Sequence, residues 1–157
     1  MSPEPVSHRA GRVGPADGAA VAAVFGAARA GMTYLPALHT ADEDRAFFTD
    51  RVLGSGAHFV TMAEAGGAVV AFSAVRDGWL EHLYVTPPSQ GRGIGSALLR
   101  QAMAENPGGL ELWVFEPNVR ATALYRRLGF GVVERTDGGR NEERVPDLRM
   151  RWTGSAG

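Results

Sequence analysis

Three glycines at alternate positions carry the clearest chemical signal in the sequence. Gly91, Gly93 and Gly95 follow the apolar run Leu83–Val85 and precede a segment with helical spacing. Glycines allow successive backbone N–H groups to converge on one point, and a helix that starts there adds its free N–H groups and the positive end of its dipole. The segment therefore predicts an anion site, most often for phosphate, beside which Arg92 adds a mobile positive charge.

The kind of phosphate ligand can be narrowed by elimination. A Walker loop requires a lysine, and the chain has none. The dinucleotide fingerprint requires glycine or alanine three residues after its second glycine, where this sequence has Ser96 or Leu98. A plain nucleotide-binding module is therefore disfavoured. A glycine-rich helix start without any ligand would give the same pattern and stays open as an alternative.

Turn residues and hydrophobic periodicity indicate the elements that would position this loop. We expect strands over 6–13, 57–63, 68–76, 79–85, 110–116, 130–135 and 145–152. We expect helices over 17–30, capped by Asp17, and over 40–53, 93–105 and 118–128. This order predicts a mixed α/β sheet with helices on its faces.

Length and composition indicate a single soluble domain. The chain has 157 residues, 45 % of them apolar and 21 % charged, which suits one hydrophobic core. We expect one domain over 6–153, a disordered segment over 1–5 and a frayed tail over 154–157. The longest apolar run, Ala19–Ala28, is too short to cross a membrane. We expect it to form a helix rather than part of a signal peptide, and the protein to be cytoplasmic.

The charged and sulfur-containing residues exclude several classes of protein. The net charge of −1 disfavours a strongly basic nucleic-acid-binding protein. The absence of cysteine excludes disulfides, thiolate nucleophiles and iron–sulfur clusters. His39 and His58 lack the spacing of metal ligands, so we expect no metal site. Lysine Schiff-base chemistry is excluded because all 16 side chains that are positive at pH 7 are arginine.

Two segments together resemble the GNAT superfamily of N-acetyltransferases. The motif Q-x-x-G-x-G at 90–95, directly after a strand end, is similar to the acyl-CoA pyrophosphate loop of that superfamily, and the segment 118–130 follows at the spacing that the superfamily uses. The resemblance implies an α/β (α+β) fold: a mixed, mostly antiparallel sheet of six to seven strands with about four helices, splayed between the fourth and fifth strands. It also implies transfer of acetyl from acetyl-CoA to a primary amine of a small molecule or peptide by direct attack in a ternary complex. Ala71 departs from the glycine that many members have before Phe72.

The resemblance places the acetyl-CoA contacts on the strand end, the loop and the start of a later helix. The expected contacts are Leu83, Tyr84, Val85, Gln90, Gly91, Arg92, Gly93, Ile94, Gly95, Ser96, Asn118 and Arg120. It implies that backbone groups of Leu83 and Val85 pair with the pantetheine, that the Val85 N–H can stabilise an oxyanion, and that the N–H groups of 91–96 hold the pyrophosphate. Asn118 also suits a helix N-cap, and Arg120 is equally compatible with a solvated helix arginine.

Attack by an amine on a thioester needs a proton acceptor, and the departing thiolate benefits from a proton donor. The resemblance places Tyr125 beside the thioester as the acid, although the apolar stripe of its helix also suits a core residue. Glu81 is the candidate base because some family members have a carboxylate there, and His82 is the alternative because imidazole titrates near neutral pH. A solvated Glu81 without a catalytic role is a third interpretation. Strand alternation places Glu81 on the face of Leu83, with His82 on the other face.

The acceptor site is the least specified part of the sequence. The late segment 137–147 borders the acceptor cleft in this fold, where Glu142 and Glu143 could attract a cationic amine. Tyr34, followed by Leu35 and His39, could form the opposite wall. Arginines interleave with the acidic residues, so a solvated, neutral loop is equally compatible.

The leading hypothesis is therefore an acetyl-CoA-dependent N-acetyltransferase with no metal and no nucleic-acid or membrane partner. The alternative is a non-catalytic acyl-CoA sensor of the same fold, in which Glu81 and Tyr125 only pack. Release of CoA that depends on an added amine separates the two. The family also makes a homodimer conceivable.

Overall fold

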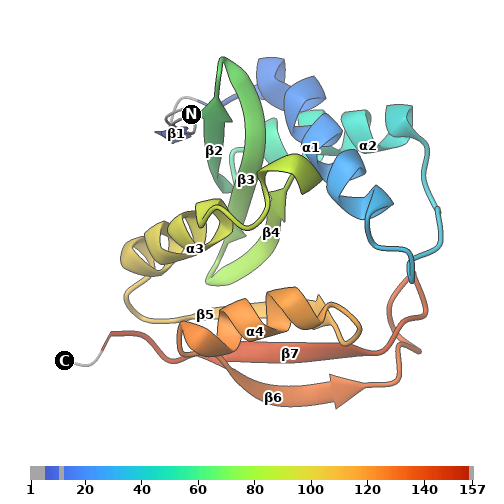
Figure 1. The fold of residues 1–157 in the computed structure, drawn as a ribbon, viewed down its shortest axis with the longest axis vertical. Coiled ribbons are helices and arrows are strands. Elements are labelled where there is room, and N and C mark those ends of the chain that lie inside the picture. The colour runs from blue at the N-terminus through green and yellow to red at the C-terminus, as the bar shows by residue number, and fades with distance from the viewer. Residues whose placement is uncertain (1–5, 11–12, 156–157) are drawn as a thin grey trace.

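One mixed sheet positions every other element of the molecule. The computed structural model describes residues 6–10 and 13–155. The strands are β1 (Val6–Ala10), β2 (Phe59–Ala65), β3 (Ala68–Arg76), β4 (Trp79–Val85), β5 (Leu110–Phe115), β6 (Gly131–Thr136) and β7 (Asp147–Trp152). Within the described residues they pair in the order β1-β2-β3-β4-β5-β7-β6, all antiparallel except β4 and β5, which are parallel (Figure 1). The predicted mixed, mostly antiparallel sheet is confirmed.

The helices also occur in the predicted order. They are α1 (Gly18–Ala30), α2 (Ala41–Phe47), α3 (Ile94–Glu105) and α4 (Val119–Arg127). The expected helix over 40–53 is an α-helix only as far as Phe47, and continues as a π-helix over Phe48–Leu53. Its start is fixed by a capping box, in which the Glu43 N–H donates to Thr40 Oγ1 at 3.1 Å and the Thr40 N–H donates to Glu43 Oε1 at 3.0 Å.

Asp17 occupies the N-cap position of α1, as expected, but its side chain does not cap the helix. Its Oδ2 instead accepts a hydrogen bond from the Gly14 N–H at 3.0 Å, because Asp17 itself belongs to a short 3-10 turn, Pro15–Asp17, that leads into α1.

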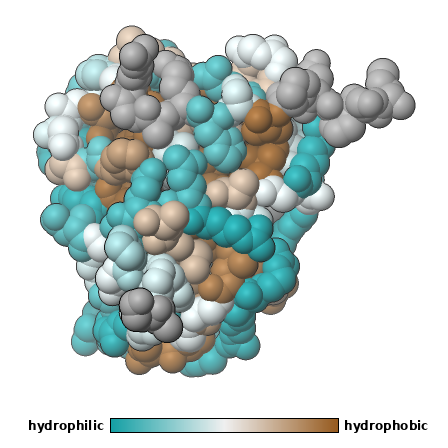
Figure 2. Space-filling model, turned by 90° about the vertical axis from the view of Figure 1, so that its left-hand side faces the viewer, coloured by the Kyte–Doolittle hydropathy of each residue, from teal (hydrophilic) through white to brown (hydrophobic). Residues whose placement is uncertain are grey.

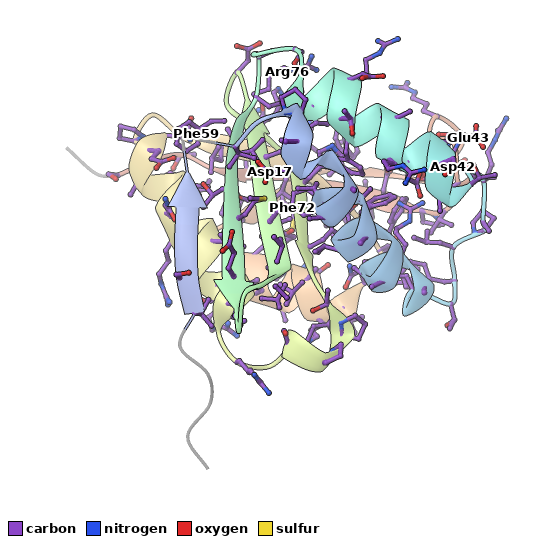
Figure 3. The ribbon with its side chains drawn as sticks, turned by 90° about the horizontal axis from the view of Figure 1, so that it is seen from above. Asp17, Asp42, Glu43, Phe59, Phe72 and Arg76 are labelled. Carbon is purple, nitrogen blue, oxygen red and sulfur yellow. The ribbon has the colours of Figure 1, made fainter. Side chains whose placement is uncertain are left out.

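Helices cover both faces of the sheet. Seen from above, α1 and α2 lie on one side of β2 and β3, and α3 lies on the other (Figure 3). The first layer buries Phe48 and Phe72 against the valines of α1. The second layer buries Leu99 of α3 and Tyr125 of α4 against β5 and β7. Two cores on opposite faces therefore hold the sheet rigid on either side of its middle.

The middle of the sheet is open. The parallel strands β4 and β5 pair at a single position, Trp79 with Glu111. The Glu111 N–H also donates to the carbonyl of Gly78 at 2.9 Å, and the strands diverge beyond this point. Because the two strands run in the same direction, their carboxyl ends lie on the two sides of the gap. The splay predicted between the fourth and fifth strands is confirmed.

The outer surface is mixed in character. Figure 2 shows hydrophilic side chains over most of one face, with hydrophobic residues in separate patches. No helix within residues 6–10 and 13–155 is long and apolar enough to span a membrane.

Candidate active site

A cleft of about 590 Å³ opens at the splay between β4 and β5. Its walls come from the end of α1 and the segment after it, from β4, from the glycine-rich loop and from the first turns of α4. It brings together twelve of the residues predicted from the sequence: Tyr34, Leu83, Tyr84, Val85, Gln90, Gly91, Gly93, Gly95, Ser96, Asn118, Arg120 and Tyr125. It therefore runs from the start of α3 to the far side of the sheet.

The glycine-rich loop presents free backbone N–H groups to one end of the cleft. Gly91 and Gly93 have φ of +80° and +82°, a left-handed conformation that residues with a Cβ rarely adopt. Gly93 precedes α3, and the first N–H bonded along the helix is that of Ala97, which donates to Gly93 O at 3.0 Å. The N–H groups of residues 94–96 therefore lack helical partners and suit an anion.

Side chains tie this loop to both neighbouring elements. Gln90 Nε2 donates to the carbonyl of Val85 on β4 at 3.0 Å, and Arg120 Nη1 of α4 donates to Gln90 Oε1 at 3.2 Å. A Cβ on Gly91 would lie 3.2 Å from Arg120 Nη2, so the guanidinium directly borders the loop backbone. Arg120 therefore adds positive charge where the free N–H groups converge.

The edge of β4 that faces the gap offers backbone groups that pair with no neighbouring strand in the described residues. The Thr86 N–H donates to Val70 O at 2.9 Å, so position 86 faces β3. Because successive residues of a strand point their N–H and C=O groups to opposite edges, those of Leu83 and Val85 point away from β3 and toward the gap. This edge can accept an extended chain as an added strand.

Tyr125 lies in the core and also borders the cleft. It is 7 % exposed and packs in the core against Phe130, with ring centroids 5.8 Å apart, and it also lines the cleft. Burial raises the pKa of the Tyr125 hydroxyl well above its usual range, so the group keeps its proton. Asn118 is the expected N-cap of α4, since its Oδ1 accepts from the Ala121 N–H at 3.2 Å.

A β-bulge sets the position of Glu81. Ala74 pairs with His82 and Val75 pairs with Leu80, which leaves Glu81 without a cross-strand partner. The regular alternation expected through this part of β4 is therefore interrupted, and Leu80 and Leu83 both join the core beneath α3 and α4.

The Glu81 carboxylate is held by two basic side chains. It is bonded to His58 Nε2 at 2.6 Å and accepts from Arg76 Nε at 3.0 Å, at the end of β3 that Figure 3 labels. Burial alone would raise the pKa of the Glu81 carboxyl, but hydrogen bonds and charge from His58 and Arg76 outweigh it and lower the pKa below its ordinary value. Glu81 is not among the residues that line the cleft.

His82 is enclosed by aromatic rings. Its ring lies 5.1 Å from that of Phe48 and 6.3 Å from that of Phe72, and its Nδ1 has no hydrogen-bond partner among the described residues. Burial lowers the pKa of His82 to about 4, so the imidazole is neutral at pH 7. His82 is also absent from the lining of the cleft.

Contacts join α1 and the segment after it to the segment before β7, at the end of the cleft away from the glycine-rich loop. We expect the acceptor at this end and call it the acceptor end. In Figure 1 the connection from β6 to β7 reaches toward the segment that follows α1. Glu142 binds His39 Nε2 at 2.7 Å, and Glu143 lies 4.0 Å from Arg29 Nη2. Both acidic residues predicted to attract a substrate amine therefore have basic partners within the chain, and neither lines the cleft.

Arg29 contacts several elements at the acceptor end, and no motif in the sequence marked it as a site residue. Its guanidinium carbon lies 5.2 Å from the centre of the Phe25 ring and 5.9 Å from that of Phe115. Tyr34, whose ring centroid is 6.4 Å from that of Phe115, has a buried hydroxyl without a hydrogen-bond partner in the described part of the chain. Burial raises the pKa of Tyr34, so this hydroxyl is protonated and free to bond a ligand.

Comparison with known proteins identifies the family. The acetyltransferase (GNAT) family matches residues 27–130, which include the cleft from α1 to the end of α4. The chain belongs to the acetyltransferase (GNAT) family. The resemblance drawn from residues 90–95 and 118–130 is thereby confirmed.

Individual GNAT proteins agree with this assignment. Streptothricin acetyltransferase of Streptomyces lavendulae is 41 % identical over 71 residues, which cover 42 % of this chain and 38 % of the relative. The chain thus matches less than half of the length of this curated relative. The apo-form YjaB of Escherichia coli has the same fold, with a TM-score of 0.70 and 23 % identity over 96 % of this chain and 99 % of that one. Nourseothricin acetyltransferase has a TM-score of 0.56 and 25 % identity over 63 % of this chain and 66 % of that one.

Not every predicted contact of this GNAT chain lies in the cleft through its side chain. Arg92 is exposed and does not line it. Ile94 is 5 % exposed and packs in the core, so only its backbone N–H is available to a ligand. The sequence analysis missed Met32 and Pro117 in the cleft wall, since neither residue type signals a function. No group of three potential metal ligands occurs within the described ranges.

Proposed function

We propose that this GNAT-family chain is an N-acetyltransferase that moves an acetyl group from acetyl-CoA to a primary amine of a small molecule or peptide. The observation that carries the proposal is the continuity of the cleft. Free N–H groups at the start of α3, the open edge of β4, Tyr125 and the unpaired hydroxyl of Tyr34 all border the same space. An anion site, a strand-like groove and a proton donor thus occur together.

The cleft suits acetyl-CoA by its donors. The N–H groups of 94–96 and the Arg120 guanidinium suit the pyrophosphate, because both present positive charge at the same end of the cleft. The N–H and C=O groups of Leu83 and Val85 suit the amides of the pantetheine arm. When bound there, acetyl-CoA supplies an activated acetyl group as a thioester. Gln90 holds the carbonyl of Val85 through a single hydrogen bond that a ligand amide can replace.

Residues of this chain then move two protons. A C–N bond forms as the C–S bond breaks, the amine loses a proton, and the departing sulfur gains one. Tyr125 is the proposed donor to sulfur, since its raised pKa keeps the hydroxyl protonated. Tyr34 is the proposed group that orients the amine, because its buried hydroxyl has no partner in the described residues.

The proton acceptor is proposed to be Glu81, reached through water, with His82 as the alternative. Glu81 is ionised at neutral pH and is hydrogen-bonded to His58, to which it can pass a proton that it accepts. His82 opposes protonation because of its burial. Comparison of the pH–rate profiles of Glu81→Gln and His82→Gln separates the two, and an unchanged profile in both variants would reject both.

The test uses the lack of cysteine in the chain. Protein, acetyl-CoA and a panel of amines are mixed, and the thiol of released CoA is followed with a disulfide dye. The panel contains amino acids, polyamines, peptide N-termini and, because of the named relatives, streptothricin and nourseothricin. Amine-dependent release above a blank without protein supports the proposal. Binding of acetyl-CoA without any amine-dependent release would favour the non-catalytic sensor.

A further inference from the structure

A second cavity lies beside the acceptor end of the cleft. It has a volume of about 380 Å³ and is lined by Trp113 and Phe115 of β5, by Asp147 at the start of β7, and by Thr136, Arg140 and Asn141. Phe115 pairs with Asp147 across the sheet, and Thr136 pairs with Asp147 on the other side, so their side chains form one row. The cavity therefore lies on the sheet face opposite the core under α4.

Phe115 lies between this cavity and the cleft. The Phe115 side chain lines the cavity, while its ring centroid is 6.4 Å from that of Tyr34, which lines the cleft. One aromatic ring thus lies between the two spaces. The cavity and the cleft are therefore close neighbours at this ring.

Most polar groups of the cavity already have partners. The Asp147 carboxylate accepts a hydrogen bond from the Thr136 hydroxyl and another from Asn141 Nδ2 at 3.2 Å. Asn141 Nδ2 also donates to Val145 O at 2.6 Å, and its Oδ1 accepts from the Val145 N–H at 3.2 Å. These residues shape the loop and have little left to offer a ligand.

Arg140 is the exception. Its guanidinium makes no hydrogen bond, ion pair or ring contact to any residue within 6–10 and 13–155. Of the nearby acidic residues, Glu142 is bound to His39, Glu143 lies against Arg29, and Asp147 is bonded to the neutral side chains of Thr136 and Asn141. On the sheet, Arg149 pairs with Glu111 at 2.6 Å. The cavity therefore combines aromatic walls, the unpaired guanidinium of Arg140 and the carboxylate of Asp147.

We propose that this cavity binds the carboxylate of the acceptor, so that the substrate is an amino acid or short peptide with an apolar side chain. The proposal rests on the N-acetyltransferase function proposed above. Arginine binds carboxylates through two parallel hydrogen bonds, and Trp113 and Phe115 offer apolar area to a side chain. A carboxylate fits better than a phosphonate, because the second negative charge of a phosphonate would face Asp147.

The test compares substrates that differ only in the group that replaces the carboxylate. L-phenylalanine, L-phenylalaninamide and the phosphonate analogue of phenylalanine are assayed with the native chain, Arg140→Gln and Arg140→Lys. Arg100→Gln is the matched control, because Arg100 is an exposed arginine of α3 outside both cavities. We expect kcat/KM for phenylalanine to fall by about tenfold to a hundredfold in Arg140→Gln, mainly through KM, as for the loss of a charged hydrogen bond. The values for the amide and for acetyl-CoA should stay unchanged, and Arg140→Lys should keep part of the preference.

Direct binding separates this proposal from the proposed function. Calorimetry measures the binding of N-acetylphenylalanine and of its amide, and this measurement requires no enzymatic turnover. Binding of the acid that Arg140→Gln weakens and Arg100→Gln does not would support the pocket, even if no amine is acetylated. Equal binding of acid and amide, an equal loss for both in Arg140→Gln, no binding of the acid, or a preference for the phosphonate would overturn it.

The aromatic walls are tested separately. Trp113→Ala removes a side chain that is 44 % exposed, and Val133→Ala removes one of equal exposure on β6, outside the cavity. We expect Trp113→Ala to reduce the preference for phenylalanine over glycine by about tenfold, as for lost aromatic burial. A similar reduction in Val133→Ala, or none in Trp113→Ala, would contradict the assignment of Trp113 to the acceptor.

Discussion

The two ends of the cleft are formed by different kinds of groups. The end at α3 is made of backbone: two glycines with positive φ, the free N–H groups of residues 94–96 and the edge of β4. The acceptor end is made of side chains from distant segments, with Arg29 of α1 against Glu143 and Phe115. A site made of backbone groups depends little on the identity of the side chains, whereas a site made of side chains changes with each substitution. Mutations should therefore have separable effects at the two ends.

Tyr125 lies where the two ends meet, so its loss should have the largest effect. In Tyr125→Phe we expect kcat to fall by about 10²- to 10³-fold, in the range of general acid catalysis, because the sulfur then leaves without a proton. Acetyl-CoA affinity, measured by calorimetry, should be unchanged. Tyr34→Phe is the comparison, since it removes the unpaired hydroxyl of Tyr34 and should raise the acceptor KM instead of lowering kcat. Full turnover in Tyr125→Phe would assign the residue to the core alone.

His82 should make the stability of the fold sensitive to acid. Burial lowers its folded-state pKa to about 4, below the ordinary value of 6.5, so the unfolded chain binds more protons between these values. Stability is therefore present above pH 6.5 and is lost as the pH falls toward 4, by about 3 kcal/mol in total. Urea unfolding from pH 7 to pH 4 measures the loss. His82→Gln should remove this component, and an unchanged pH dependence in the variant would show that His82 does not carry it.

Gly93 tests the backbone end. In Gly93→Ala the φ of +82° should destabilise the fold by about 1–2 kcal/mol. Displacement of even one N–H from the anion should weaken acetyl-CoA binding by about tenfold to a hundredfold. Gly26→Ala is the control, because a Cβ there meets nothing within 4 Å and the residue lies within α1. Unchanged acetyl-CoA affinity in a folded Gly93→Ala would place the anion elsewhere.

The same contrast explains what the sequence could reveal. Turn residues and periodicity predicted the order of the four α-helices and seven strands in the described residues, and the glycine spacing predicted the loop at 91–95, because both patterns are local. The cap at Asp17 failed because Gly14 competes for its carboxylate. The bulge at Glu81 was invisible because it depends on the register with β3, and its partner His58 lies 23 residues away. Side-chain sites of this kind need the fold before they can be found.

Arg29 tests the acceptor end, where smaller effects are expected. Its guanidinium lies over the rings of Phe25 and Phe115 and near Glu143, so it connects α1 with both β5 and the segment before β7. In Arg29→Met we expect the acceptor KM to rise by about fivefold to tenfold, since each ring contact contributes ~0.5–1 kcal/mol. The KM for acetyl-CoA should not change, and Arg100→Met should resemble the native chain.

A double-mutant cycle sharpens this last prediction. If Arg29 acts by holding the segment before β7, then Glu143→Gln should raise the acceptor KM in the native chain and have little further effect in Arg29→Met. Additive effects would mean that the two side chains act on the acceptor independently, and a parallel rise in the KM for acetyl-CoA would mean that the two ends of the cleft are not separable. Coupling that affects only the acceptor KM would instead mean that Arg29 holds the segment before β7 in place. Arg29 would then also determine where Arg140 and the second cavity lie.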